Sequence, residues 1–316
     1  MSDSQPFVSV IILSHNGVSY LNDCLRTVID QDYPQDRYEV ILADNGSTDG
    51  SQELIRNEYP QVIVLDFGRN HGFARGNNLA KDAARGELLV FLNQDTIVGR
   101  TWLRALVEAL TIEGYHACSS NILSPRNGEF RGVEARATPT HVYYYELTKF
   151  GYADQLIVSF REQVIPTTFI SGASFIIRRD IIERVSYLFD ETLGTYCEDT
   201  ELALRLWRAG FRVGAAPRSV VYHFSSFSYS LERHKVWKHF MMIRNRFFAY
   251  RKALPPREFI ARLPYLAVSH PHKVFKRARS INRGSLESCA LATAAAVATL
   301  GVFVWFCLAI MWNPDR

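Results

Sequence analysis

A carboxylate and a carboxamide stand two residues apart at Asp95 and Asn93, directly after the apolar run 88–92. Residues two apart on a strand point to the same side, and their oxygen atoms suit Mg²⁺ or Mn²⁺. Such cations usually bind through one or two carboxylates together with substrate phosphates. The pattern therefore predicts a divalent cation at Asp95. A turn in which Asp95 caps the following helix explains the same residues equally well.

Two acidic residues, Glu198 and Asp199, open a segment whose apolar spacing predicts a helix over 198–209. A carboxylate at the end of such an element can face a ligand, so Asp199 is placed to take a proton from an attacking hydroxyl group. The alternative is structural, because Thr195 and Glu198 match a capping box and acidic groups are favoured in a first helical turn.

Asp44 follows the apolar run 38–43 in a loop of turn-forming residues. A carboxylate at the end of a buried strand suits a ribose hydroxyl or a base edge, so Asp44 is a candidate nucleotide contact. Ser47 and Asp49 in the same loop are more typical of turn and helix-cap residues.

Three basic side chains later in the chain are further candidates. His223 is a possible third metal ligand or phosphate contact, although a single histidine is more often structural. Arg244 and Arg246 are candidate phosphate clamps. A basic face on a helix that lies on a membrane explains the two arginines equally well.

Strands and helices must position these residues, and the hydrophobic pattern alternates between the two. Apolar runs typical of buried parallel strands occur at residues 7–13, 38–43, 62–65 and 88–92. Helical patterns lie between them, at residues 20–29, at 51–57 and after the loop 68–78. The alternation predicts an α/β fold with a mostly parallel central sheet and helices on both faces. Ligands bind beyond the carboxyl ends of such strands, where the polar loops of this chain lie.

The second half of the chain is less regular. We interpret residues 125–165 as mostly loop with some helix, and 169–178 as a strand interrupted by Gly172. A long basic and aromatic helix is predicted over 231–254, where Pro255 and Pro256 end it.

Composition excludes several classes of protein. The 316 residues have a net charge of +4, 47% hydrophobic and 22% charged residues, which is ordinary for a globular protein and unlike a disordered or collagen-like chain. A surplus of this size does not indicate nucleic-acid binding. The five cysteines form no CxxC or Cys/His cluster, which argues against a zinc site or a disulfide framework and favours a reducing compartment. The first residues do not match a signal peptide. No dinucleotide-binding, P-loop or GxSxG motif occurs at the expected places.

The C-terminal region has the pattern of a membrane attachment. The run from Cys289 to Trp312 has no charged residue, and as a helix it is about 36 Å long, enough for a hydrocarbon core of about 30 Å. Five basic residues between Lys273 and Arg283 precede it, which predicts that everything before the run lies in the cytoplasm. The same basic residues suit anionic lipid headgroups. A buried core helix or hairpin is the alternative for this run.

Seven segments, in this order and spacing, resemble the inverting family-2 glycosyltransferases, which have the glycosyltransferase A-type fold. The resemblance covers roughly residues 7–250. Within the family, the chain is similar to the bacterial rhamnosyltransferase-like branch of cell-surface polysaccharide synthesis. The segments are VSVIILSHN (8–16), CLRTVIDQDYP (24–34), VILADNGSTDGS (40–51), NHGFARGNN (70–78), LLVFLNQD (88–95), FISGASFIIRR (169–179) and YCEDTELALRLWRAGFRV (196–213).

The resemblance implies a role for each candidate residue. Donor-side roles, in binding the nucleotide sugar, fall on Ser14, Asn16, Asp44, Asn70, Gly72, Asn77, Asn93, Arg244 and Arg246. Asp95, with His223, would bind the Mg²⁺ or Mn²⁺ ion that bridges the diphosphate. Asp199 would be the general base, with Gly172 and Glu198 on the acceptor side. Asn93 stands where many members have Asp, which lowers the charge of the cation site.

The resemblance also implies a division of the chain. Residues 1–230 would form the catalytic domain, with a nucleotide-binding half at 1–115 and an acceptor half at 116–230. Residues 231–285 would be a basic membrane-proximal region, and 286–316 a transmembrane or membrane-associated helix.

The expected function is transfer of a sugar from dTDP-rhamnose or a UDP-hexose to a lipid-linked or nascent cell-surface glycan, at the cytoplasmic face of the membrane, with inversion. Membrane lipid is an expected partner and nucleic acid is not. One alternative is a catalytically silent scaffold that binds nucleotide sugars at a membrane. Another is a nucleotidyltransferase, which the lack of a Gly-rich basic N-terminal loop disfavours.

Overall fold

The computed structural model describes residues 5–123, 139–147, 153–224, 232–264 and 301. The chain forms two compact units. The first consists of Met1–Glu146 with Ala153–Ser225, and the second of Leu147–Tyr152 with Ser226–Arg316. The sheet and the candidate catalytic residues belong to the first unit, and the long basic helix belongs to the second.

Strands and helices alternate through the first half of the chain, as the hydrophobic pattern predicts. The strands are β1 (Val8–Ser14), β2 (Tyr38–Asp44), β3 (Ile63–Asp66), β4 (Leu88–Asn93), β5 (Thr96–Val98), β6 (Ala117–Leu123), β7 (His141–Leu147), β8 (Ala153–Ser159), β9 (Ile165–Pro166), β10 (Ser174–Arg178) and β11 (Val213–His223). The helices are α1 (Val18–Ile29), α2 (Ser51–Glu58), α3 (Phe73–Ala83), α4 (Trp102–Thr111), α5 (Arg179–Arg184), α6 (Glu198–Arg208) and α7 (Glu232–Ala253), and a single 3₁₀ turn spans Gln35–Arg37.

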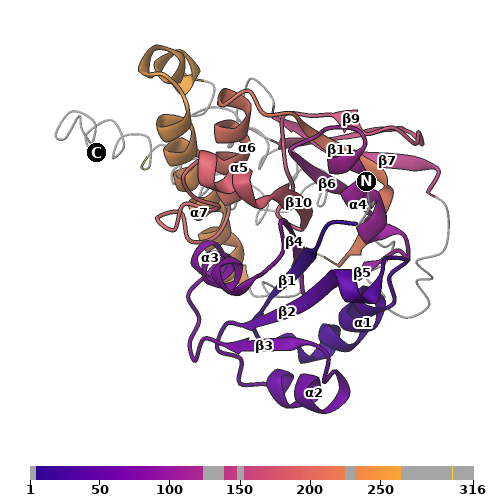
Figure 1. Cartoon of the computed structure of the whole chain (residues 1–316). Helices are drawn as coiled ribbons and strands as arrows, with labels where there is room; N and C mark the ends of the chain where they lie inside the picture. The colour runs from indigo at the N-terminus through magenta and orange to yellow at the C-terminus, as the bar shows by residue number, and fades with distance from the viewer. Residues whose placement is uncertain (1–4, 124–138, 148–152, 225–231, 265–300, 302–316) are drawn as a thin grey trace, which may run out of the picture. The chain divides into compact units, whose positions relative to one another are not determined.

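The main sheet has the strand order β3-β2-β1-β4-β10-β6-β11-β5, with β9 beside β11. Strands β3, β2, β1 and β4 are all parallel, so their carboxyl ends lie along one edge (Figure 1). β10 is inserted antiparallel between β4 and β6, while β6 and β11 are parallel. The predicted α/β fold is therefore confirmed as a mixed sheet with a parallel N-terminal half.

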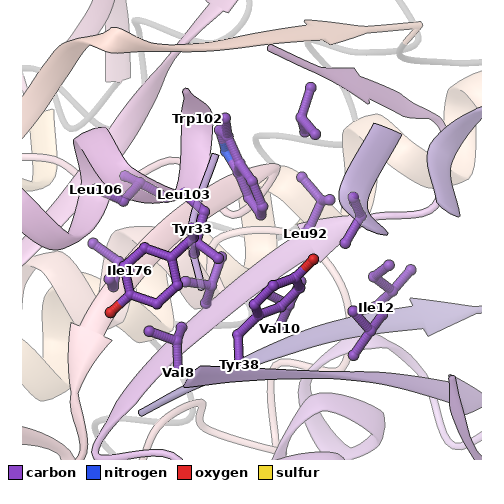
Figure 2. Packing of buried hydrophobic residues seen from close by; sticks show 14 of the residues in the cluster. Val8, Val10, Ile12, Tyr33, Tyr38, Leu92, Trp102, Leu103, Leu106 and Ile176 are labelled. Atoms are coloured by element: carbon purple, nitrogen blue, oxygen red, sulfur yellow. The ribbon is translucent and has the colours of Figure 1, made fainter. Parts of the chain in front are cut away.

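Helices cover both faces of this sheet, because the side chains of a strand alternate between its two faces. Val8, Val10 and Ile12 of β1 belong to one core cluster, together with buried residues of α1, α2 and α4. Figure 2 shows these three residues in one cluster with Trp102 of α4. Ile11 belongs to a second cluster, formed with α3, α5 and α6. Strand β1 is therefore buried on both sides, which explains why its sequence, VSVIILS, is mostly apolar.

The prediction for residues 125–165 was wrong where the structure describes them. Strands β7 and β8 lie there and form a separate two-stranded sheet. Valine and tyrosine favour extended backbone, so the HVYYYEL segment of β7 is a strand sequence that proline and glycine nearby had obscured. The predicted strand at 169–178 is also shorter, since β10 begins at Ser174, after Gly172.

The long helix predicted at 231–254 is confirmed as α7. Among the residues that the structure describes, no helix is both long enough and apolar enough to cross a membrane. The predicted membrane segment, residues 286–316 with its apolar run 289–312, lies outside the described residues except for Gly301.

Candidate functional site

The candidate residues converge where β1, β2 and β4 end. Ser14, the last residue of β1, pairs in register with Asp44, the last residue of β2. On the other side of β1, Leu13 pairs with Asn93, the last residue of β4. The polar loops that follow these strands therefore share one edge of the sheet, as predicted from their places after apolar runs.

Asp44 is fully buried and has one oxygen without a protein partner. Its Oδ2 accepts hydrogen bonds from the N–H of Ser47 at 3.0 Å and from Nε2 of Gln52 at 2.6 Å. Its Oδ1 has no partner and no exposure to solvent. A buried carboxylate oxygen without a partner is costly, so Oδ1 is a strong acceptor for a ligand hydroxyl or N–H group.

Ser14 and Asn16 hold the loops of this edge together. The Ser14 hydroxyl donates to Oε1 of Gln94 at 2.7 Å, which joins the ends of β1 and β4. Oδ1 of Asn16 accepts the N–H of Thr48 at 2.9 Å, which joins the loops after β1 and β2. Both side chains are therefore bonded within the protein, and they set the shape of the edge around Asp44.

Asn45 is a residue that sequence reasoning missed. Its Nδ2 donates to Oδ1 of Asn70 at 3.1 Å and to the carbonyl of Gly72 at 3.2 Å, while its Oδ1 accepts the N–H of His71 at 2.8 Å. These three bonds hold the 70–72 loop against the end of β2. The available signal was its place directly after Asp44, where the turn-rich loop begins.

Gly72 and Asn77 lie at the start of α3. Gly72 has φ 79° and ψ 175°, a backbone conformation that favours glycine, and immediately precedes the helix. Asn77 is buried in α3, and its Nδ2 donates to the Phe73 carbonyl at 2.9 Å. The structure thus places Asn70 and Gly72 beside Asn45, while the donor-pocket role of Asn77 stays a prediction.

Asp95, Asn93 and His223 come together although they are far apart in sequence. The last residue of β11, His223, pairs with Thr96 of β5. As a result, its Nε2 lies 3.2 Å from Oδ1 of Asp95 and 3.2 Å from Nδ2 of Asn93. The Asp95 and His223 side chains are mostly buried. The helix-cap alternative for Asp95 is wrong, because the next helix begins only at Trp102, after Thr101.

The donor atoms of these three residues fit a divalent cation. Nε2 of His223 cannot form a hydrogen bond with both neighbours. If Nε2 carries a proton, it can donate to Oδ1 of Asp95 but cannot accept from Nδ2 of Asn93, and if Nε2 has no proton, the reverse holds. A cation between the imidazole and the carboxylate removes this conflict and suits an amide oxygen from Asn93. Within the described residues, no group of three or more His, Cys, Asp or Glu side chains could hold a metal. Substrate oxygens would have to complete the coordination, as the prediction of a diphosphate-bridging cation requires.

Asp199 lies at the second position of α6 and faces Gly172. Its Oδ2 accepts the Gly172 N–H at 3.3 Å, and its Oδ1 accepts the N–H of Thr200 at 2.7 Å. Burial raises the pKa of the Asp199 carboxyl above its ordinary value, while these two hydrogen bonds act in the opposite direction. The pKa of Asp199 is thus closer to neutral pH than that of an ordinary aspartate. A base with a pKa near the working pH both gains and loses a proton readily.

Glu198 is buried beside Asp199, and its Oε2 has no partner. Burial, followed by the negative charge of Asp199, raises the pKa of Glu198 well above its ordinary value. The capping-box alternative is wrong, because α6 is preceded by Cys197, with φ 68° and no side-chain cap. Tyr196 also has a positive φ, 74°, so the backbone before the acidic pair is strained, which is typical of functional loops.

Replacing Glu198 with glutamine is expected to change the pH dependence of stability. Since the folded-state pKa is raised, the folded protein keeps a proton that the unfolded chain loses as pH rises above 4.5. Wild-type stability should therefore fall relative to Glu198→Gln by about 1.4 kcal/mol per pH unit, until the folded-state pKa is passed. Below pH 4.5 the difference should be constant.

Urea unfolding of wild type and Glu198→Gln between about pH 4 and pH 8 measures the difference in their free energies of unfolding. This pH range is roughly the one in which the difference is expected to change. Glu183→Gln is the matched control, because Glu183 is an exposed glutamate of α5 in the same unit. Parallel stability curves for wild type and Glu198→Gln would contradict the raised pKa.

The segments predicted to bind the acceptor and the donor meet at the start of α3. The N–H of Ala74 donates to the carbonyl of Gly194 at 2.8 Å, which joins α3 to the loop before α6. A methyl group placed on Gly172 would lie 3.6 Å from Oδ2 of Asp199 and 3.8 Å from the Phe73 ring. A side chain at Gly172 would therefore occupy the space in front of the carboxylate.

Arg244 and Arg246 belong to α7 of the second unit. Nη1 of Arg244 donates to Oδ1 of Asn245 at 2.8 Å, and its guanidinium lies over the Phe248 ring. Their role as phosphate clamps stays a prediction.

Comparison of the chain with known proteins identifies its relatives. The model of the family described as "Glycosyl transferase family 2" matches residues 9–186. "Glycosyltransferase AglE" of Haloferax volcanii is 32% identical over 125 residues, which are 39% of this chain and 41% of that protein. "N-acetylglucosaminyl-diphospho-decaprenol L-rhamnosyltransferase" of Mycobacterium tuberculosis is 26% identical over 60% of this chain and 67% of its own length.

Among solved structures, a mannosyltransferase from Pyrobaculum calidifontis in complex with GDP-Man and Mn²⁺ covers 99% of this chain and 89% of its own, with a TM-score of 0.59 and 20% identity. This likeness shows a shared glycosyltransferase A-type fold. In sequence, the chain spans between 16% and 50% of the length of five curated relatives that it matches.

Proposed function

Because this chain belongs to glycosyltransferase family 2, we propose that it transfers a sugar from a nucleotide-diphosphate sugar to a hydroxyl group of a growing cell-surface glycan. The observation that carries the proposal is the geometry of one sheet edge. A buried, unpartnered oxygen of Asp44 and the Asp95–His223 pair lie where β2 and β4 end, and the Asp199 loop contacts α3 beside them.

At the donor end, Asp44 Oδ1 accepts a hydroxyl of the nucleotide ribose or an N–H of the base. The hydrogen bonds of Ser47 and Gln52 to Oδ2 hold the carboxylate in one orientation, so the free oxygen is preorganised for this contact. Ser14, Asn16 and Asn45 contribute by holding the surrounding loops.

At the diphosphate, Asp95 and His223 would hold a divalent cation, with Asn93 beside them. The chemistry that Mg²⁺ or Mn²⁺ would supply when bound there is neutralisation of the charge on the leaving nucleoside diphosphate, an effect commonly worth several kcal/mol. Asn93 contributes an oxygen without a charge, so the cation gains less electrostatic energy here than between two carboxylates.

At the acceptor end, Asp199 takes the proton of the attacking hydroxyl, a role typically worth about 10²–10⁴-fold in rate. The Gly172 N–H holds Oδ2 of Asp199 in place, and the bare Gly172 backbone leaves the space in front of the carboxylate open. A base on one side of the anomeric carbon and a cation-bound leaving group on the other give a single displacement with inversion.

The finer assignment of substrates rests on the relatives and on the C-terminal sequence. The similarity to a rhamnosyltransferase named for a lipid diphosphate acceptor supports dTDP-rhamnose, with a UDP-hexose as the alternative donor, and a lipid-linked acceptor. The basic residues 273–283 and the apolar run 289–312 support a location at the cytoplasmic face of the membrane.

A thermal-shift screen of common sugar nucleotides, with and without Mn²⁺, tests the proposal. The true donor should stabilise the protein by about 2.7 kcal/mol at a concentration 100 times its Kd. The screen should include dTDP-rhamnose, UDP-glucose, UDP-N-acetylglucosamine and GDP-mannose, followed by an assay of transfer to octyl glycosides.

Stabilisation by no sugar nucleotide would contradict the proposed function. Stabilisation without hydrolysis or transfer would instead support the alternative of a catalytically silent scaffold, which the uncharged Asn93 favours.

A further inference from the structure

The β7–β8 hairpin lies outside the main sheet, yet its first strand is fixed to it. Asn121, a fully buried residue of β6, donates from Nδ2 to the carbonyl of His141 at 3.1 Å and accepts the N–H of Tyr143 at 2.8 Å. The N–H of Phe160 donates to the carbonyl of Thr140 at 3.0 Å and closes the base of the hairpin. Strand β7 therefore has a defined position and register beside β6.

The segment 167–172 connects β7 to the candidate base. The hydroxyl of Thr167 donates to the carbonyl of Tyr145. Five residues later, the N–H of Gly172 donates to Oδ2 of Asp199 at 3.3 Å. Tyr145 and Asp199 are therefore attached to the two ends of one short segment.

The side chain of Tyr145 has a fixed ring and a proton to donate. Its ring packs against Phe169, with 6.0 Å between the ring centroids. Its hydroxyl oxygen accepts a hydrogen bond from Nε2 of Gln155 at 3.4 Å. Burial, with the negative charge of Asp199, raises the pKa of Tyr145, so the phenol is protonated at neutral pH. A hydroxyl that accepts one bond still has its own O–H to direct at a ligand.

From these contacts, and resting on the proposed function, we propose that Tyr145 binds the acceptor sugar. Its O–H donates a hydrogen bond to an oxygen atom of the acceptor sugar. Asp199 deprotonates the attacking hydroxyl of the same sugar. The Phe73 ring lies beside Gly172 and can pack against the apolar face of a sugar, while the buried Phe169 ring supports the ring of Tyr145. Strand β7 thus recognises the acceptor, and it is separate from the loops that bind the donor.

Steady-state kinetics of full-length Tyr145→Phe test this inference, because the change removes one hydroxyl and keeps the ring. The donor is the nucleotide sugar found by the screen, and the acceptor is the octyl glycoside that accepts it. We expect the acceptor KM to rise about five- to tenfold, as for a neutral hydrogen bond. The donor KM and the slow hydrolysis of the donor by water should stay unchanged. Tyr144→Phe, the same change one residue earlier on β7, is the matched control.

An unchanged acceptor KM in Tyr145→Phe would overturn the inference while leaving the proposed function intact. A parallel rise in the donor KM, or a lowered thermal stability, would show that Tyr145 has only a structural role and would overturn it too. Absence of transfer by the wild-type protein to every sugar would overturn the proposed function and this inference together.

Discussion

Asp199→Asn is expected to reduce the kcat of sugar transfer by about 10²–10⁴-fold, the usual contribution of a general base. Asparagine has the shape of aspartate, and its one oxygen can keep either the Gly172 or the Thr200 hydrogen bond, but it cannot take the acceptor proton. Binding of the donor should change little, because Asp44 and Asp95 lie at the ends of β2 and β4, whereas Asp199 lies on α6. The measurements are kcat for transfer and the Kd of the nucleoside diphosphate.

The control for Asp199→Asn is Asp180→Asn, since Asp180 is an exposed aspartate paired with Arg178 on the same unit. This variant should retain wild-type kcat and Kd. Turnover close to that of wild type in Asp199→Asn would remove Asp199 as the base. A large loss of nucleotide binding together with turnover would indicate a misfolded site, which the thermal midpoint of the variant would reveal.

Asp95→Ala should cause the second large loss, of about 10²-fold or more in kcat, since the cation effect is worth several kcal/mol. Among the described residues, the one carboxylate paired with His223 is that of Asp95, so its removal leaves an imidazole and an amide, a weak set for Mg²⁺ or Mn²⁺. Mn²⁺ should then no longer tighten nucleoside diphosphate binding. Titration of Mn²⁺ with calorimetric measurement of the diphosphate Kd checks this result.

Asn93→Asp is the matched variant for the cation site, and it is expected to strengthen Mn²⁺ binding where Asp95→Ala weakens it. It adds a carboxylate beside Asp95 and His223 in place of an amide of equal size, so the concentration of Mn²⁺ that gives half-maximal activity should fall. If Asp95→Ala still showed Mn²⁺-dependent donor binding, the cation would have to bind elsewhere. A half-maximal Mn²⁺ concentration in Asn93→Asp that equals the wild-type value would contradict a metal role for this site.

Much of the donor side could be predicted before any coordinates. The apolar runs of β1, β2 and β4 can be buried on both faces only in a parallel sheet covered by helices, and parallel strands end along one edge. Ser14, Asp44 and Asp95 each follow such a run. Their proximity was therefore implied by hydrophobic pattern and strand direction alone, without side-chain detail.

The position of β7 beside the Asp199 segment could not be predicted in this way. The segment around β7 combines prolines, glycines and tyrosines, and its local pattern did not distinguish a strand from a loop. The contacts of Asn121 with His141 and of Thr167 with Tyr145 depend on where β6 and the 167–172 segment pack, which no local sequence window reports. Tyr145 was therefore not among the candidate residues predicted from the sequence.

The sequence by itself determined which residue types are available for chemistry and which strands place them at one edge, because burial periodicity is a local property. The tertiary structure alone decided which distant groups meet. His223 reaches Asp95 only because β11 pairs antiparallel with β5 in one register. Glu198 has a buried, unpartnered oxygen at the first position of α6, which the packing of that helix in the first unit determines. Both outcomes depend on long-range pairing and desolvation, which arise only when the whole sheet and its helices are assembled.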